Sequence, residues 1–164
     1  MMGAGKSSVG KRLARRLDLP FVDSDEEISE AAGGISTGDI FELYGEAAFR
    51  DGERRVVARL IDGPVRVIAT GGGVFVNPAT RTLVNARAIS VWLDAPLPVL
   101  AQRTARNPNR PMLRGPNPEQ VLARLLDERR SAYAEAHIHI SSRDDAHAEV
   151  VEAIVTAIEG FLAR

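Results

Sequence analysis

The first eight residues, MMGAGKSS, place a glycine-rich turn directly before a helical pattern, and this junction constrains the fold most strongly. Gly5-Lys6-Ser7 fits the end of a P-loop, which reads Gly, four residues, Gly-Lys, then Ser or Thr. The first glycine of that pattern falls one residue before Met1. Apolar residues follow the loop at helical spacing, as Val9, Leu13 and Leu17. Because a P-loop joins a strand to a helix, the chain is expected to adopt an α/β fold.

The residues of this loop have the chemistry to hold phosphate groups. Small residues leave backbone N–H groups open to phosphate oxygens, Lys6 adds a point charge, and the Ser7 hydroxyl suits Mg²⁺. The basic residues are almost all arginine, which makes a lysine at position 6 more informative. The alternative for so short a motif is an ordinary glycine-rich helix start. The residues expected to contact a nucleotide are Gly3, Ala4, Gly5, Lys6, Ser7 and Ser8.

The composition is that of a single soluble domain. The chain has 164 residues, of which 45% are hydrophobic and 26% charged, and its net charge is −1. A nearly neutral chain gives no indication of a nucleic-acid partner. It contains no cysteine, and no apolar run suggests a membrane span or a signal peptide. We therefore expect one domain over residues 1–164, cytoplasmic and monomeric, with no membrane or nucleic-acid partner.

Strand-like and helix-like segments alternate along the chain. The sequence predicts strands at residues 20–23, 65–69, 88–93 and 138–140 and helices at residues 26–32, 36–44, 46–61, 96–106, 119–136 and 146–162, with a short helix starting at Asn77-Pro78. Strands separated by helices predict a three-layer α-β-α sandwich with a central parallel sheet. Ligands of such sheets bind at the carboxyl ends of the strands. The proline-rich segment at about residues 106–118 is predicted to be a mobile lid loop.

Two carboxylates, Asp23 and Asp25, follow the strand predicted at residues 20–23. In the turn after a strand both can face one cavity. A phosphoryl-transfer site needs one acid near Mg²⁺ and another beside the attacking hydroxyl. The alternative is that Asp25 caps the next helix and Asp23 is solvated. The nearby P-loop favours the catalytic interpretation.

Two further features suggest anion binding. Arg50 and Glu53 share a helix face, so Glu53 can hold the guanidinium as a fork for a carboxylate; the alternative is a surface ion pair. The glycines at residues 71–73 follow an apolar strand, and they let a ligand reach main-chain N–H groups; the alternative is a plain loop.

The later part of the chain adds two arginines and three histidines. Arg110 in the lid is placed to reach a transferred phosphoryl group, unless the segment is a solvated connector. Arg129, on the following helix, is either a second anion ligand or a surface charge. The spacing of the histidines matches no metal site, so we interpret them as structural or solvated.

Taken together, these motifs resemble the shikimate kinase family, over essentially the whole chain. The resemblance depends on six motifs in the order and near the spacing of the family: residues 2–7, Phe21-Val22-Asp23-Ser24-Asp25, Ile40-Phe41 with Gly45-Glu46 and Phe49-Arg50-x-x-Glu53, Gly71-Gly72-Gly73, Arg110-Pro111-x-Leu113, and Arg129-x-x-x-Tyr133. It implies a P-loop kinase fold that uses ATP and Mg²⁺ to phosphorylate the 3-hydroxyl of shikimate. The products would be shikimate 3-phosphate and ADP, within aromatic amino acid biosynthesis.

On the nucleotide side, the resemblance implies that ATP binds along the P-loop. Ser7 would ligate Mg²⁺ and Asp23 would hold the ion through water. Lys6 and Arg110 would supply positive charge around the transferring group, and Arg103 would lie against the adenine.

On the acceptor side, the resemblance implies that Asp25 orients the 3-hydroxyl and accepts its proton. Arg50, Gly72 and Arg129 would hold shikimate, with the two arginines on its carboxylate. Two aromatic residues would wall this side of the site, Phe41 and Phe49.

The chain departs from the family pattern in two places. The P-loop of the family follows a central strand, so we expect the reading frame to begin about ten residues upstream of Met1. Around residues 142–147 the alignment slips by one residue, which leaves the role of Arg143 open. The competing interpretations are a related small-molecule kinase such as a gluconate kinase, and a P-loop domain that binds nucleotide without turnover.

Overall fold

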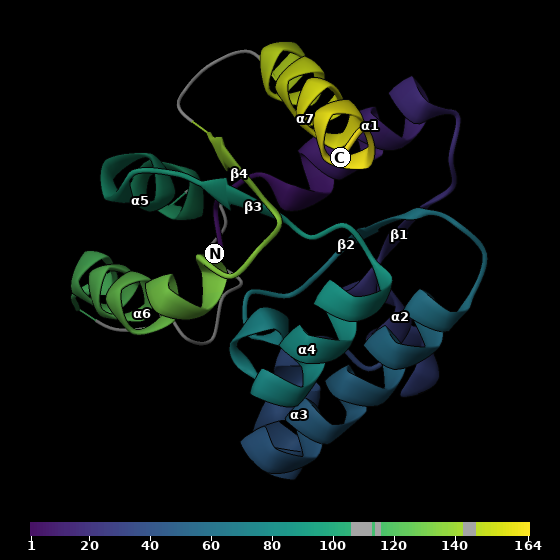
Figure 1. The fold of residues 1–164 in the computed structure, drawn as a ribbon. Coiled ribbons are helices and arrows are strands. Elements are labelled where there is room, and N and C mark those ends of the chain that lie inside the picture. The colour runs from purple at the N-terminus through teal and green to yellow at the C-terminus, as the bar shows by residue number, and fades with distance from the viewer. Residues whose placement is uncertain (106–112, 114–115, 143–146) are drawn as a thin grey trace.

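The computed structural model describes residues 1–105, 113, 116–142 and 147–164. Helices and strands alternate as the sequence predicts (Figure 1). The elements in chain order are α1 (Lys6–Leu17), β1 (Phe21–Asp23), α2 (Ser24–Ala31), α3 (Thr37–Asp62), β2 (Val67–Ala69), the 3₁₀ helix η1 (Val74–Val76), α4 (Pro78–Arg87), β3 (Val91–Asp94), α5 (Leu97–Ala105), α6 (Pro118–Tyr133), β4 (Ile138–Ser141) and α7 (His147–Leu162). The described part of the chain has no helix that combines the length and the apolar character needed to cross a bilayer.

The described strands form two parallel pairs. β1 pairs with β2, with Phe21 opposite Val67, and β3 pairs with β4, with Val91 opposite Ile138. No ladder of hydrogen bonds joins β2 to β3 within the described ranges. The α/β architecture with parallel strands is therefore confirmed, and the predicted central sheet is present as two hydrogen-bonded pairs.

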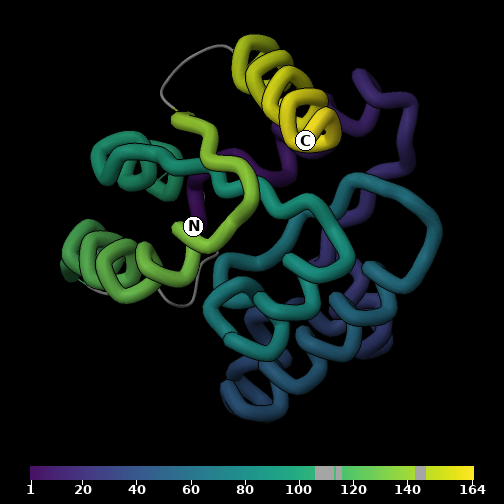
Figure 2. The backbone as a smooth tube through the Cα atoms, viewed as in Figure 1, coloured from purple at the N-terminus to yellow at the C-terminus, as the bar shows by residue number. Residues whose placement is uncertain are grey.

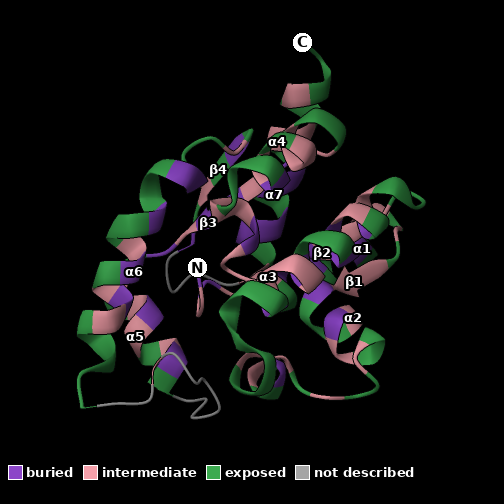
Figure 3. Cartoon of the chain, turned by 90° about the horizontal axis from the view of Figure 1, so that it is seen from below, coloured by how far each residue is buried: buried purple, intermediate pink, exposed green. Residues whose placement is uncertain are grey.

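The helices cover the strands from two sides. α1 and α7 pack against each other on one side, and α5 and α6 pack together on the other (Figure 1). The largest core cluster joins these four helices to β3, and its most deeply buried residues include Leu100, Leu122 and Ile154. Buried and exposed residues alternate around the helices, as amphipathic packing requires (Figure 3). The N-terminus lies in the interior of the molecule, where Met1 is buried (Figure 2).

A second, smaller core is formed by buried residues of α2 and α3. It contains Ile28, Ile40, Phe49, Val56 and Leu60. α3 consists of two helical parts, because Gly45 has a non-helical backbone with φ of 80°. This break confirms the prediction of one helix ending at residue 44 and another beginning at residue 46. The first part is capped by Ser36, whose hydroxyl accepts a hydrogen bond from the Asp39 N–H at 3.1 Å.

Candidate active site

The P-loop residues form a turn that leads into α1. Gly3 and Gly5 have φ of 78° and 89°, a left-handed conformation that glycine adopts without strain. A β-carbon on Gly3 would lie 3.0 Å from the Leu100 carbonyl oxygen, so the loop packs directly on α5. Gly5 precedes the first residue of α1, and its carbonyl accepts a hydrogen bond from the Val9 N–H at 2.8 Å. The predicted loop-to-helix junction is confirmed.

Two polar side chains, Arg103 and Ser142, donate hydrogen bonds to backbone carbonyls of this loop. The Arg103 guanidinium donates to the Gly3 carbonyl and to the Ser142 hydroxyl, each at 3.5 Å. Ser142 is only 2% exposed, and its hydroxyl donates to the Ala4 carbonyl at 3.3 Å. The Lys6 ammonium donates to the Met1 carbonyl at 2.6 Å. Arg103 therefore lies beside the phosphate loop, and its contact with adenine stays a prediction.

Asp23 connects the P-loop to the strand end of β1. The Ser7 hydroxyl donates to one Asp23 carboxylate oxygen at 2.6 Å, and the Asp25 N–H donates to the other at 3.0 Å. The alternative with Asp25 as the helix cap and Asp23 in solvent is wrong, since Asp23 itself caps α2. A hydroxyl and a carboxylate that meet in this way are hard oxygen ligands of the kind that Mg²⁺ takes.

Asp25, in the first turn of α2, lies against the glycine segment. A β-carbon on Gly71 would be 3.0 Å from an Asp25 carboxylate oxygen and 3.0 Å from a Glu53 carboxylate oxygen. Burial raises the pKa of Asp25, and the negative charges of Asp23 and Glu53 raise it further, whereas Lys6 and Arg50 lower it. A partly desolvated carboxylate with a raised pKa is a stronger base than a solvated aspartate.

The raised pKa of Asp25 also predicts a stability effect. Between the unfolded value of 3.8 and the higher folded value, the folded state binds more protons, so stability falls as the pH rises through this window. Asp25→Asn is therefore expected to raise Tm at about pH 7, and the gain should vanish as the pH approaches about 4. Thermal unfolding of both proteins across this pH range tests it. A lower Tm for the variant at neutral pH would contradict the expectation.

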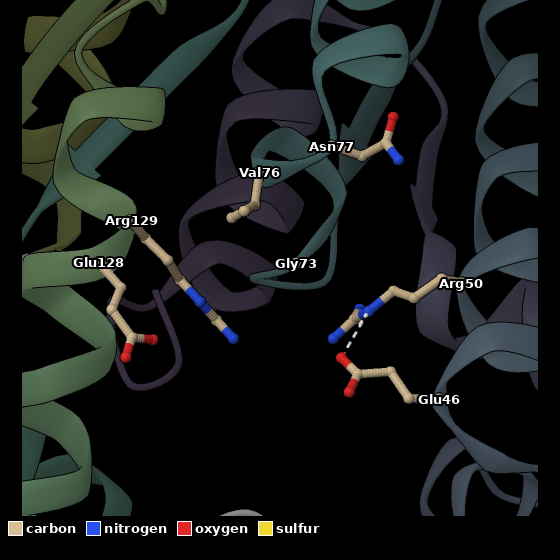
Figure 4. A pocket seen from close by; sticks show the side chains of 7 residues that line it. All are labelled: Glu46, Arg50, Gly73, Val76, Asn77, Glu128 and Arg129. Carbon is tan, nitrogen blue, oxygen red and sulfur yellow. Dashed lines mark ion pairs between the residues drawn. The ribbon is translucent and has the colours of Figure 1, made fainter.

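A cavity of about 320 Å³ opens between α3 and α6. Arg50 and Arg129 enter it from opposite sides, with their guanidinium groups pointing toward one another (Figure 4). The two arginines are far apart in sequence, and the fold brings them together on either side of the glycine segment, residues 71–73, that follows β2. The lining residues are Glu46, Arg50, Gly73, Val76, Asn77, Glu128 and Arg129. Two converging arginines make this cavity a site for a small anion such as a carboxylate.

Arg50 is held by its neighbours on α3. One of its nitrogens is 2.8 Å from a Glu53 carboxylate oxygen, and another is 3.5 Å from a Glu46 oxygen. The Glu53 side chain is only 6% exposed, so the alternative of a surface ion pair is wrong. The guanidinium also lies 5.2 Å from the centre of the Phe49 ring, which meets Phe41 edge-on. The prediction that Glu53 holds Arg50 is confirmed.

The glycine segment leaves room for both arginines. A β-carbon on Gly73 would lie 2.2 Å from an Arg50 nitrogen, and one on Gly72 would lie 3.2 Å from an Arg129 nitrogen. The Gly71 N–H donates to the Ser24 hydroxyl at 3.3 Å, whereas the Gly72 and Gly73 N–H groups have no acceptor among the described residues. A side chain at Gly72 or Gly73 would therefore displace the neighbouring arginine, and ligand access to the N–H groups of this segment stays a prediction.

The comparisons with known proteins agree with this geometry. The family model described as "Shikimate kinase" matches residues 2–159. A shikimate kinase of Caulobacter vibrioides is 56% identical over 158 residues, which cover 96% of this chain and 78% of that protein. The chain belongs to the shikimate kinase family. A family member from Rhodopseudomonas palustris is 49% identical and matches 99% of this chain and 79% of its own length.

Solved structures of the shikimate kinase family share the fold. Shikimate kinase from Acinetobacter baumannii, in complex with shikimate, has a TM-score of 0.92 and 39% identity over 97% of this chain and 89% of that chain. A gluconokinase from Sinorhizobium meliloti has a TM-score of 0.63 at 20% identity, covering 97% of this chain and 87% of that one, and shows a similar fold only. The match to shikimate kinases therefore extends beyond the general architecture.

Some predicted positions lie outside the described residues, and some cavity residues were not predicted. Arg110, most of the lid and Arg143 fall in the ranges that the structure leaves out, so their roles stay predictions. Glu128 and Asn77 line the cavity, yet neither belongs to the six motifs on which the family resemblance depends. The sequence signal for Glu128 is its position directly before Arg129.

Two of the three histidines, His137 and His139, take structural positions, as predicted. The His137 ring lies 3.1 Å from the Ser90 hydroxyl and packs on Phe161, and His139 packs on Trp92. The described ranges contain no cluster of three or more His, Asp or Glu side chains arranged for a metal. A cation at the Ser7–Asp23 pair would therefore need ligands from substrate or water.

Proposed function

We propose that this chain transfers the γ-phosphoryl group of ATP to the 3-hydroxyl of shikimate, giving shikimate 3-phosphate and ADP. The observation that carries the proposal is the pair of arginines facing one another across the cavity. Asp25 follows the end of β1, where Asp23 contacts the P-loop through Ser7. This reaction belongs to the biosynthesis of aromatic amino acids through chorismate. Family membership at high identity supports the same activity.

The cavity suits the acceptor because its two arginines are opposite in charge to the carboxylate of shikimate. Shikimate has one carboxylate and several hydroxyls, and two arginines can grip the carboxylate through paired N–H donors. Arg50 is fixed by Glu53 at 2.8 Å, which keeps its fork in one orientation. Gly72 adds backbone N–H capacity beside Arg129. These contacts hold the acceptor and leave its 3-hydroxyl for Asp25.

Asp25 performs the proton transfer in this proposal. Its carboxylate orients the 3-hydroxyl and accepts the proton as the oxygen attacks the γ-phosphorus. Phosphoryl transfer depends mainly on positioning and on neutralising charge. Lys6, at the start of α1, and Arg110, from the lid, supply positive charge around the transferred group. Closure of the lid would also exclude water, which otherwise hydrolyses ATP.

The residues present fit a magnesium ion. Ser7 and Asp23 approach within 2.6 Å of each other through a hydroxyl and a carboxylate oxygen. Ser7 would ligate the ion directly and Asp23 would hold it through water. When bound, Mg²⁺ neutralises part of the negative charge on the phosphate oxygens.

The activity is tested by shikimate-dependent release of ADP from ATP and Mg²⁺, with gluconate as the competing acceptor. Turnover with shikimate and none with gluconate is the expected result. Turnover with gluconate alone would favour the related small-molecule kinase. ATP binding without turnover, in folded protein, would favour a non-catalytic P-loop domain.

Gly73→Ala is expected to raise the KM for shikimate by about 10- to 100-fold, because its methyl group displaces the Arg50 guanidinium from the cavity. The backbone tolerates alanine, since φ of Gly73 is −86°. The KM for ATP should not change. Gly160→Ala is the matched control, because a β-carbon at that position would meet nothing within 4 Å beyond the backbone of its own helix and its chain neighbours. An unaltered KM for shikimate in Gly73→Ala would show that the position of Arg50 beside this glycine does not matter for acceptor binding.

A further inference from the structure

The last residue of α6, Tyr133, reaches the glycine segment. Its side chain is 5% exposed, and its hydroxyl donates to the Gly72 carbonyl oxygen at 2.6 Å. Its ring packs on Trp92, with 5.9 Å between ring centres. Burial raises the pKa of the Tyr133 phenol above its ordinary value, so the hydroxyl stays protonated and remains a donor across the neutral range. This contact joins residues 61 positions apart in sequence.

Fixing the Gly72 carbonyl also fixes the next N–H group. The peptide between Gly72 and Gly73 is planar and trans, so its C=O and N–H point in opposite directions. With the carbonyl bound to Tyr133, the Gly73 N–H points away from α6's tyrosine. That N–H has no acceptor in the part of the chain that the structure describes, and Gly73 lines the cavity. The hydrogen bond thus sets the direction of the Gly73 N–H beside the cavity.

The rest of the segment is held by α4. One Arg81 nitrogen donates to the Phe75 and Val76 carbonyl oxygens at 3.1 and 3.0 Å, and another pairs with Glu135 at 2.8 Å. Arg81 thereby fixes η1, which leaves the Gly72–Gly73 peptide to Tyr133. Because Tyr133 follows Arg129 by four residues, both lie on the same face of α6. One helix face therefore supplies an arginine of the cavity and the anchor of the neighbouring peptide.

We propose that Tyr133 is a positioning residue for acceptor binding, which orients the Gly72–Gly73 peptide so that its N–H donates to shikimate at a fixed distance from Arg129. The inference depends on the proposed function. Tyr133 does not itself touch the acceptor in this proposal, and acts through the backbone. Without its hydroxyl, the peptide can rotate, and the half-buried Gly72 carbonyl loses its donor.

The experiment compares Tyr133→Phe with Tyr44→Phe, the only other tyrosine, which is 62% exposed. Tyr133→Phe is expected to raise the KM for shikimate about tenfold, with the KM for ATP unchanged. The phenylalanine ring keeps the packing on Trp92, so emission of this single tryptophan should match the wild type. Tyr44→Phe should leave both constants unaltered.

Three results would overturn the inference, and they differ from one another. An unchanged KM for shikimate in Tyr133→Phe, with normal turnover in the wild type, would remove the positioning role and leave the proposed function standing. A rise in both KM values together with altered tryptophan emission would show a structural role only. Absence of shikimate turnover in all three proteins would remove the proposed function and this inference with it.

Discussion

Replacing Asp25 by asparagine is expected to lower kcat by about 10²- to 10⁴-fold, the range that a positioned general base supplies. Asparagine keeps the size and the hydrogen-bonding shape of the side chain, yet it cannot accept the proton of the attacking hydroxyl. The KM for shikimate should change little, because Arg50 and Arg129 hold the carboxylate. Steady-state release of ADP at saturating ATP and Mg²⁺ measures both constants.

The pH dependence gives a second measure of the same residue. Because the pKa of Asp25 is raised by burial, the acid limb of kcat/KM in the wild type should lie above the range of an ordinary aspartate. Asp127→Asn is the matched control, since Asp127 is an exposed aspartate on α6. A kcat for Asp25→Asn within about tenfold of wild type would show that Asp25 is not the base.

The sequence predicts the local elements well because their signals are local. Ser36 and Asn77 accept hydrogen bonds from N–H groups of the helices that they precede, as short polar residues do at helix starts. Gly45 separates the two predicted parts of α3 because its φ of 80° is not helical, and glycine adopts such a positive φ without strain. The order of strand ends also predicts which motifs share a site, since parallel strands present their carboxyl ends at one edge.

The sequence predicts contacts between distant elements poorly because those contacts depend on packing. The spacing of Arg50 and Glu53 predicts their pairing, but the burial of Glu53 follows from the approach of Gly71. The hydrogen bond from Tyr133 to Gly72 has no signal in either segment alone. The division of the strands into two pairs likewise depends on which strands become neighbours in space.

Arg50→Ala is expected to raise the KM for shikimate by about 100-fold, because the carboxylate loses one of two charged forks worth about 1.5–3 kcal/mol. The change should leave the KM for ATP unaltered, since no P-loop residue lines the cavity that holds Arg50. It also leaves the buried Glu53 carboxylate without its partner at 2.8 Å, so a lower Tm is expected.

Two variants separate substrate binding from stability at this position. Arg54→Ala, one turn along α3, removes an exposed arginine paired with Asp51 and should leave the KM for shikimate unaltered. Arg50→Ala combined with Glu53→Gln removes the unpaired charge, and should recover Tm without recovering the KM. If the double variant regained wild-type affinity for shikimate, Arg50 would not contact the acceptor. A high KM with restored Tm in the double variant would instead attribute the affinity for shikimate to Arg50. The stability would then depend on the pair of Arg50 with Glu53, and acceptor binding on the contact of Arg50 with the carboxylate of shikimate.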